Sequence, residues 1–502
     1  MTQWINNHPR IVLSFLILLS FCLADGYHVI NFPPLSIHQW RQSDCFAYAR
    51  NYFTKNDGLF RPSFYNLAVK EGRSISELPV FYYVAAKLFH LFGVHYWVLR
   101  GLTFLSYLLG LYYLFACIRF WIKDTLASLF PVILLATTPY FYYYALNFLP
   151  NVPAISFSFC GLYYMLLYER KAHIKHLIIS TAFFILSVLI KPTDGGLILA
   201  AYLCVAGKDI LFNKLNFKKF IPVLLSTVII GILFLSWVKY VNWYNNSNEN
   251  QLNLLGIYPI WDMTRKEIAD TFTLRIAGFW ARIYQDMSIL YFILILLVVY
   301  IIKWKYLDNF LKFFTLFLLL GGLTYSVLWF KAFAILDYYQ LINVIPPAFL
   351  IITITEYFIR TVSVNPRKSL MITGKFVMIV FIVVSLFHNR DMQHERYFDK
   401  GQTDQPKNLF TTEPYLRQIG IAPEDIVISI PDLSPNITLV AFGNPGYTSL
   451  FDVDSFTLCH FKNHGAKYLI INDTSYLHNK LYTPYMNKPV GHNDFIYVFD
   501  IR

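Results

Sequence analysis

The acid best suited to chemistry is Asp44, which lies in a polar stretch between two long apolar segments. A carboxylate that is partly removed from water has a raised pKa, so it is suited to act as a general base or to bind a divalent metal. An alternative needs no chemistry, because Ser43 is a plausible N-cap for a helix over 43–50 whose N-terminus Asp44 would complement.

A second acid, Glu77, closes the same polar stretch just before Leu78-Pro79. It faces one site with Asp44 if the loop folds back on itself. The structural alternative is a first-turn acid on a helix that starts near Pro79. His38 and Arg41 come from the beginning of the stretch and are candidates for substrate binding.

Three cations are candidates for holding a phosphate, namely Lys191, Arg100 and Lys331. Each falls at the outer end of an apolar segment. Alternatives remain for each: Lys191 pairs with Asp194 in a polar turn, Arg100 snorkels, and Lys331 anchors the chain at the interface.

Further polar residues fall at the same ends of apolar segments. Asp194 and the run Asp337-Tyr338-Tyr339 are candidates for substrate binding, and interfacial anchoring is the alternative for that run. Asn147 and Asn151 flank Pro150 and are expected to cap a helix. A site of carboxylates and cations at one membrane face fits chemistry on an anionic lipid headgroup.

The composition predicts an α-helical polytopic membrane protein. Hydrophobic residues make up 56% of the 502 residues and charged residues only 14%, whereas soluble domains have roughly 25% charged residues. Apolar runs long enough to cross a bilayer recur along the chain. The eleven predicted spans are 10–29, 96–118, 125–145, 151–168, 174–190, 194–212, 219–242, 286–304, 308–330, 341–360 and 370–389.

The distribution of basic residues orients these spans. The net charge is +12, but the Lys and Arg residues cluster in short loops between spans, which indicates topology rather than a nucleic-acid partner. The positive-inside rule holds if the N-terminus is inside and segment 79–93 lies along the surface. The first loop, 30–95, is then extracytoplasmic. We expect the protein in a bacterial inner or plasma membrane, with its active site on the extracytoplasmic side.

Two domains follow from this pattern. Residues 1–389 form a transmembrane domain that includes the loop 30–95, and residues 390–502 form a small extracytoplasmic α/β domain. Strands are predicted at Ile426–Ile430, Tyr468–Ile471 and Ile496–Ile501, and a helix is predicted from Asp454 to His464, where Gly465 ends it.

The sequence lacks the motifs GxxxxGK[ST], HExxH and GxSxG, which disfavours an ATP-driven pump, a zincin and a usual serine hydrolase. A flippase or transporter for a lipid carrier is an alternative, but its ionisable residues would lie mid-span and internal repeats would be expected. A glycan polymerase or ligase is another alternative, which a larger central outer loop would favour.

The chain resembles the GT-C glycosyltransferases, in particular the family 39 and family 83 group of protein O-mannosyltransferases and aminoarabinose transferases. Three segments carry the resemblance: His38-Gln39-Trp40-Arg41-Gln42-Ser43-Asp44, then Glu77-Leu78-Pro79 through Arg100, and Asp337-Tyr338-Tyr339 with Pro346. Many relatives have a second acid where Cys45 stands here and a further acid where Asn151 stands.

This resemblance implies transfer of a sugar, usually with inversion, from a polyprenyl-phosphate donor to a lipid, glycan or protein acceptor outside the cytoplasm. Asp44 would be the essential acid, acting as base or as a metal ligand. Lys191, Arg100 and Lys331 would hold the donor phosphate. No nucleotide cofactor is implied, because the donor already carries the activation.

Overall fold

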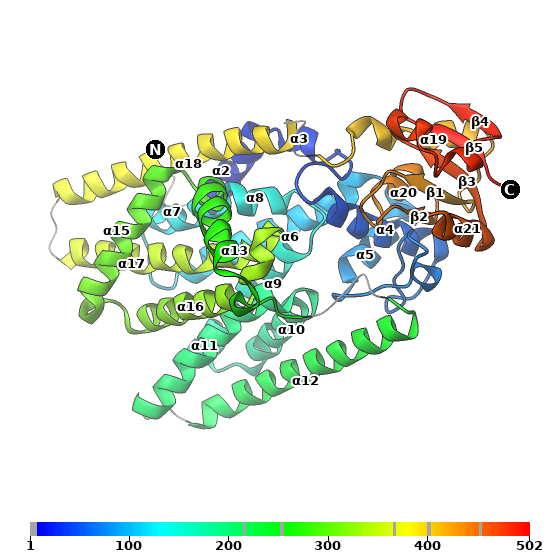
Figure 1. Ribbon diagram of the computed structural model, residues 1–502. Coiled ribbons are helices and arrows are strands. Elements are labelled where there is room, and N and C mark those ends of the chain that lie inside the picture. The colour runs from blue at the N-terminus through cyan, green and yellow to red at the C-terminus, as the bar shows by residue number, and fades with distance from the viewer. Residues whose placement is uncertain (1–7, 214–216, 251–255, 365–367, 399–402, 451–453) are drawn as a thin grey trace. The chain divides into compact units, whose positions relative to one another are not determined.

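The structure is a computed structural model that describes residues 8–213, 217–250, 256–364, 368–398, 403–450 and 454–502. The chain forms two compact units, whose elements are labelled in Figure 1. The helical unit comprises the described residues of Met1–Val29, Thr103–Val238 and Gly256–Glu395. The mixed unit comprises the described residues of Ile30–Leu102, Lys239–Leu255 and Arg396–Arg502.

The helical unit consists of long apolar helices and short connecting turns. All or most of the following elements belong to it: α2 (Pro9–Leu23), α3 (Gly26–Val29), α6 (Tyr96–Ile118), α7 (Thr125–Ala136), α8 (Pro139–Ala145), α9 (Asn151–Lys171), α10 (Ile174–Ile190), α11 (Pro192–Asn213), α12 (Phe217–Ser247), η2 (Ile260–Asp262), α13 (Arg265–Asp270), η3 (Thr271–Trp280), α14 (Ala281–Tyr284), α15 (Met287–Lys303), η4 (Trp304–Tyr306), α16 (Asn309–Leu328), η5 (Phe330–Ala334), η6 (Asp337–Val344), α17 (Ile345–Val364) and α18 (Lys368–Phe398).

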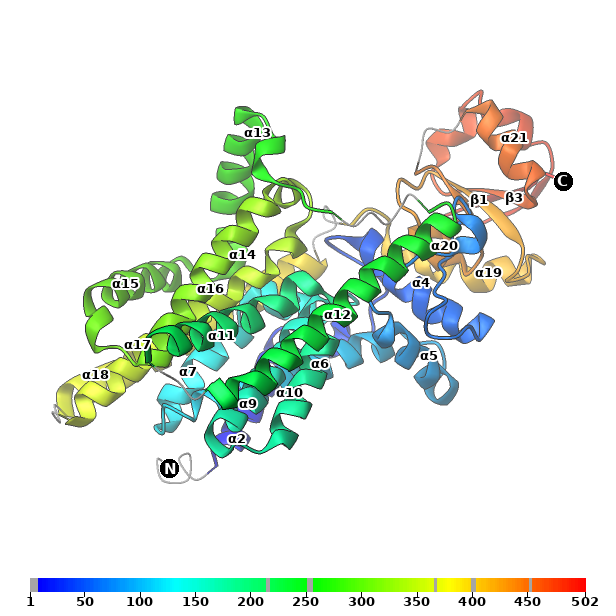
Figure 2. The ribbon, with the colours of Figure 1, turned by 90° about the horizontal axis from the view of Figure 1, so that it is seen from below.

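Small and hydroxyl residues bring neighbouring helices of this unit close together. Gly161 of α9 lies against the ring of Phe184 on α10, where a Cβ atom would approach the ring to 2.9 Å. Two serines of α10 donate across the same interface, Ser180 to the carbonyl of Gly161 at 2.7 Å and Ser187 to that of Ala154 at 2.6 Å. Close backbone approach and interhelical hydrogen bonds are the usual stabilising contacts between helices in lipid. Helices α9, α10 and α11 pack on one another, and α11 packs on α16, as Figure 2 also shows.

The protein is an integral multi-pass membrane protein. Within the described residues, six helices are long and apolar enough to cross a membrane, and a seventh span results if the bent pair α7 and α8 counts as one. Each of the eleven predicted apolar segments falls on helical structure. Their number as membrane spans stays a prediction. Segment 79–93 forms the short helix α5 (Val80–Phe92) of 13 residues, a length below that of a usual crossing.

The mixed unit joins helices of the first loop to a small sheet from the C-terminal part of the chain. Its remaining elements are α4 (Gln39–Lys55), η1 (Lys70–Gly72), η8 (Lys407–Thr411), α19 (Glu413–Gln418), β1 (Ile426–Ile430), α20 (Ile437–Phe442), β2 (Gly446–Thr448), α21 (Ser455–Asn463), β3 (Ala466–Ile471), η9 (Thr474–His478), η10 (Thr483–Tyr485), β4 (Pro489–His492) and β5 (Tyr497–Asp500). The first loop thus packs with the C-terminal domain in one unit, whereas the predicted division at residue 389 stays a prediction.

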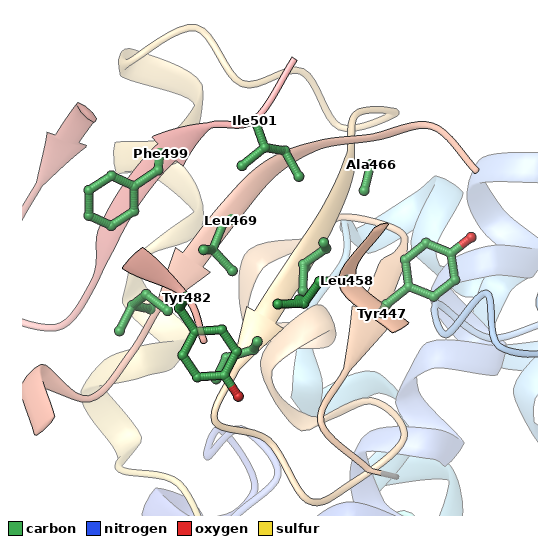
Figure 3. Packing of buried hydrophobic residues seen from close by; sticks show 10 residues of the cluster. Tyr447, Leu458, Ala466, Leu469, Tyr482, Phe499 and Ile501 are labelled. Carbon is green, nitrogen blue, oxygen red and sulfur yellow. The ribbon is translucent and has the colours of Figure 1, made fainter. Parts of the chain in front are cut away.

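The sheet has the strand order β2-β1-β3-β5-β4. Strand β1 pairs in parallel with β2 and β3, and β5 pairs antiparallel with β3 and β4. Figure 3 shows the apolar cluster that covers one face, with Leu458 from α21, Leu469 from β3 and Phe499 from β5. Burying such side chains stabilises the domain by roughly 1.5–3 kcal/mol each.

The predicted strands and the predicted helix of this domain are confirmed. Strands β1, β3 and β5 coincide with the three predicted runs to within a few residues. Helix α21 begins after Asp454, whose side chain accepts a hydrogen bond from the backbone of Thr457, and Gly465 follows the helix at a φ of +93°. Strands β2 and β4 were not predicted.

Candidate active site

Helix α4 places Asp44 inside the mixed unit. The helix begins at Gln39 after His38, whose φ of 57° is left-handed, and no acid lies in its first turn. The expected N-cap role of Ser43 is therefore wrong, and so is the interpretation of Asp44 as a first-turn acid. Asp44 lies one turn further along the helix, where its side chain is only 6% exposed.

The Asp44 carboxylate accepts a hydrogen bond from the C-terminal part of the chain. The Nδ2 atom of Asn436, the residue before α20, donates to Oδ1 of Asp44 at 2.6 Å. The Oδ1 atom of Asn436 accepts the backbone N–H groups of Tyr65 and Asn66, each at 3.1 Å. One buried amide therefore ties the acid to two separate segments of the mixed unit.

Glu77 is paired with Arg41, whose charge also acts on Asp44. Its Oε1 atom pairs with Nη2 of Arg41 at 2.5 Å and accepts from the hydroxyl of Tyr82 at 2.7 Å. Helix α5 has its N-cap at Pro79 and no acid in its first turn, so the interpretation of Glu77 as a first-turn acid is wrong. The ion pair is buried, and such a pair holds its geometry because breaking it leaves an uncompensated charge.

Burial and these neighbours set the pKa of Asp44. Removal from water is the largest effect, and it raises the pKa of this carboxyl to about 7. Arg41 and the hydrogen bond from Asn436 act in the opposite direction, whereas the charges of Glu77 and Asp432 raise the pKa further. A carboxyl with a pKa near neutrality is suited to accept a proton from a hydroxyl group.

Arg100, the predicted phosphate-binding cation of the mixed unit, is bonded to backbone carbonyls instead. The side chain of Arg100 is 0% exposed, so it does not snorkel. It donates to the carbonyls of Phe32 and Pro33 at 3.1 and 2.9 Å and to Oε1 of Gln42 at 3.3 Å. Its role as a phosphate ligand stays a prediction, which these occupied donors disfavour. His38 is half-buried at the start of α4.

A second polar cluster lies in the helical unit around Asp194. This residue is in the first turn of α11 and is 1% exposed. Its Oδ2 atom accepts from Nδ2 of Asn151 at 2.9 Å and from the hydroxyl of Thr193 at 3.1 Å. Its Oδ1 atom is buried and has no hydrogen-bond partner among the described residues. A buried acceptor of this kind is suited to a ligand hydroxyl.

Lys191 occupies the tight turn between α10 and α11 that the topology predicted. Its Nζ atom lies 5.1 Å from the ring centroid of Tyr339 and 5.9 Å from that of Tyr338. No ion pair between Lys191 and Asp194 is present within the part of the chain that the structure describes. The charge of Lys191 nevertheless acts on Asp194, so the alternative of a self-paired polar turn stays open beside the role in phosphate binding.

Asn151 and Asp337 complete this cluster. Asn151 is the first residue of α9, and its amide also reaches the carbonyl of Tyr338 at 3.4 Å. Its expected capping role is wrong, because it links three elements instead. Asp337 is buried and accepts from the hydroxyl of Tyr144. Lys331, in contrast, is exposed on η5.

The structure thus groups the predicted residues in two sets. One set, in the mixed unit, contains His38, Arg41, Asp44, Glu77 and Arg100. The other, in the helical unit, contains Lys191, Asp194, Lys331, Asp337, Tyr338 and Tyr339. Sequence reasoning missed Asn436 as a site residue. The run Asn436-Ile437-Thr438 has the form of a glycosylation sequon, but its asparagine is fully buried.

A divalent metal at Asp44 stays a sequence-based expectation. Among the residues described, no group of three His, Cys, Asp or Glu side chains is placed to hold a metal ion. Glu77 is paired with Arg41, and Asp432 accepts from Ser434 and Thr438. The acids nearest Asp44 are therefore committed to other partners, and the mechanism below uses no metal.

Comparison with known proteins agrees with this architecture. Residues 76–239 match the family model described as dolichyl-phosphate-mannose-protein mannosyltransferase. The crystal structure of ArnT from Cupriavidus metallidurans in the apo state is similar at a TM-score of 0.61 and 13% identity, over 98% of this chain and 98% of that chain. The structure of the same enzyme bound to undecaprenyl phosphate gives a TM-score of 0.60 and 14% identity, over 100% of this chain and 98% of that one.

A search of the curated proteins by sequence found no match. The structural likeness and the family model together confirm the resemblance to the GT-C superfamily of glycosyltransferases, whose fold this chain has. The two structural matches cover 98% and 100% of this chain.

Proposed function

We propose that this protein transfers a sugar from a polyprenyl-phosphate-linked donor to an acceptor on the extracytoplasmic side of the membrane, with inversion at the anomeric carbon. The observation that carries the proposal is the buried, electrostatically tuned carboxyl of Asp44 in a chain with the GT-C fold. The likeness to an enzyme solved with undecaprenyl phosphate supports a lipid-phosphate donor.

In the proposed reaction, an acceptor hydroxyl attacks the anomeric carbon from the side opposite the lipid phosphate. A new bond forms between the acceptor oxygen and the anomeric carbon, and the bond from that carbon to the phosphate oxygen breaks. The hydroxyl proton passes to Asp44, and the polyprenyl phosphate leaves with the bonding electrons. No nucleotide is consumed, because the sugar phosphate is already activated.

Lys191 is the cation best placed to hold the donor phosphate. Its ammonium group lies over two tyrosine rings, and its charge also acts on the neighbouring Asp194. A fixed ammonium group stabilises the negative charge that develops on a leaving phosphate. Arg100 is the less suitable candidate, because its guanidinium group is fully buried and bonded to carbonyls.

The proposal is tested with purified protein in proteoliposomes. The donors are a panel of undecaprenyl-phosphate-linked hexoses and pentoses, and the acceptors come from a total envelope extract of the source strain. We expect a labelled product with wild-type protein and none with Asp44→Asn. Movement of the labelled carrier across the bilayer without transfer would instead identify a flippase.

A further inference from the structure

Asn436 stands at a helix start but does not act as a helix cap. An asparagine at the N-cap usually accepts a hydrogen bond from the first turn of the helix, yet this side chain makes no such bond. Asp432 and Ser434 cap helix α20 instead. Oδ2 of Asp432 accepts the backbone N–H of Thr438 at 2.8 Å, and Oγ of Ser434 accepts that of Ile437 at 2.9 Å. The Asn436 amide is thereby left for other partners.

The orientation of this amide is fixed by its partners. The backbone N–H groups of Tyr65 and Asn66 only donate, so the atom that faces them must be the amide oxygen. The –NH2 group must then face Asp44 and donate to its carboxylate. Exchanging the two ends of the amide would place donors against donors, so the assignment follows from the network itself.

The segment that orients Asn436 is itself fixed to the edge of the C-terminal sheet. The N–H of Gly446 donates to the carbonyl of Tyr65 at 3.0 Å, and the N–H of Leu67 donates to the carbonyl of Gly446 at 2.8 Å. The Asn66 side chain donates to the carbonyl of Pro435 at 2.8 Å. A Cβ atom on Gly446 would lie 1.9 Å from the carbonyl oxygen of Val427, so the chain approaches this closely only at a glycine.

We propose that Asn436 is a positioning residue for the transfer reaction, because its amide holds the Asp44 carboxylate in the orientation that receives the acceptor proton. This inference rests on the role given to Asp44 above. It makes the C-terminal domain a component of the catalytic machinery, since the domain supplies the polar group that fixes the base.

The groups that act on Asp44 come from several elements. Arg41 lies on its own helix, Glu77 precedes α5, and Asp432 precedes α20. The charge of Asp44 acts in turn on Cys45 and Tyr48 of the same helix. Glu77 and Asp432 are both acids with other partners. Of the two groups that favour the ionised form of Asp44, Arg41 is paired with Glu77, whereas Asn436 donates a hydrogen bond to the Asp44 carboxylate.

The substitution Asn436→Asp distinguishes a positioning role of Asn436 from a purely structural role. The aspartate keeps an oxygen for the N–H groups of Tyr65 and Asn66, but when ionised it has no donor for Asp44. Two adjacent carboxyls then compete for one proton. Asn444→Asp is the matched control, because Asn444 is a buried amide of the same domain that donates to the carbonyls of Ala422 and Asp425.

The experiment restores each variant to a strain that lacks the chromosomal copy. Mass spectrometry then measures the envelope glycan that is lost on deletion, per amount of folded protein. We expect Asn436→Asp to lower product formation at least about 100-fold, with an unchanged increase in melting temperature on addition of undecaprenyl phosphate. Asn444→Asp should lower the melting temperature without a comparable loss of product per folded molecule.

The outcomes separate this inference from the proposed function. Product formation by Asn436→Asp within twofold of wild type, with Asp44→Asn inactive, would overturn the positioning role alone. An active Asp44→Asn variant would overturn the proposed role of Asp44. If Asn436→Asp does not accumulate as folded protein, Asn436→Ala takes its place. That variant should lose at least about tenfold in product formation, and wild-type output from it would contradict the inference.

Discussion

Two buried aspartates, one in each unit, are held in the same way and differ in their surroundings. Asp44 and Asp194 each accept a hydrogen bond from an asparagine that is distant in sequence, at 2.6 and 2.9 Å. Asp44 also lies among charged groups, namely Arg41, Glu77 and Asp432. Asp194 lies at a helix start and keeps one carboxylate oxygen without a partner among the described residues.

This difference indicates a division of labour. Around Asp44, burial and neighbouring charges shift the pKa of the carboxyl that we propose as the proton acceptor. For Asp194, whose neighbour Lys191 lies over two tyrosine rings, we propose a role in binding a hydroxyl-bearing ligand. An asparagine amide by itself therefore does not identify a base, and the proposal that Asp44 is the base rests on the three charged groups around it.

The largest expected effect separates the two acids. Asp44→Asn should lower the turnover of transfer by about 10²–10⁴-fold, because the proton acceptor is lost. Asp194→Asn should mainly raise the donor or acceptor KM, since its role is binding. Steady-state kinetics on both purified variants measure the contrast. Equal losses of turnover in both variants would remove the distinction between the two sites.

The two cations provide the next test. Arg100→Leu leaves the carbonyls of Phe32 and Pro33 without a donor, so it should destabilise the fold by roughly 1–3 kcal/mol or more.

Lys191→Ala should instead raise the donor KM by about tenfold to 100-fold, because a charge contact with the phosphate is lost. Thermal unfolding and donor titrations measure the two properties. An unchanged donor response in Lys191→Ala would favour a purely structural lysine.

The stability of the wild-type protein relative to Asp44→Asn should depend on pH. The pKa of Asp44 is raised by burial to about 7 in the folded protein, so folding becomes less favourable as pH rises from about 4 to 7, where only the unfolded state ionises readily. At pH 8 the Asp44→Asn variant should therefore unfold at a higher temperature than wild type, by an amount equivalent to a few kcal/mol at most. The difference should shrink toward pH 4. A less stable variant at pH 8 would contradict the burial argument.

The last test concerns the rate of the wild-type enzyme. A general base must be ionised to accept a proton, so turnover should decline as pH falls below about 7, approaching tenfold per pH unit well below that value. A pH profile at saturating donor measures this. A flat profile between pH 5 and 8 would indicate that proton transfer to Asp44 does not limit the reaction.

The sequence predicted the helical framework and several strands because these follow from local patterns. Apolar runs of bilayer length and alternating β-branched residues depend only on neighbouring positions. The helix α21 was predicted because Asp454 and Gly465 are strong boundary signals.

Contacts between distant segments have no comparable local pattern in the sequence. The pairing of Asp44 with Asn436 joins residues on opposite ends of the chain, and a lone asparagine before a short helix looks like an ordinary cap. The start of α4 was misplaced for a related reason, since a left-handed His38 is an uncommon helix boundary.

The central claim is that this chain transfers a lipid-linked sugar with Asp44 as the base. It is tested most directly by comparing the envelope glycans of a deletion strain that carries either wild-type protein or Asp44→Asn, with equal amounts of folded protein. We predict that wild type restores a glycan modification of one sugar residue and that Asp44→Asn does not. Full restoration by Asp44→Asn would contradict the account.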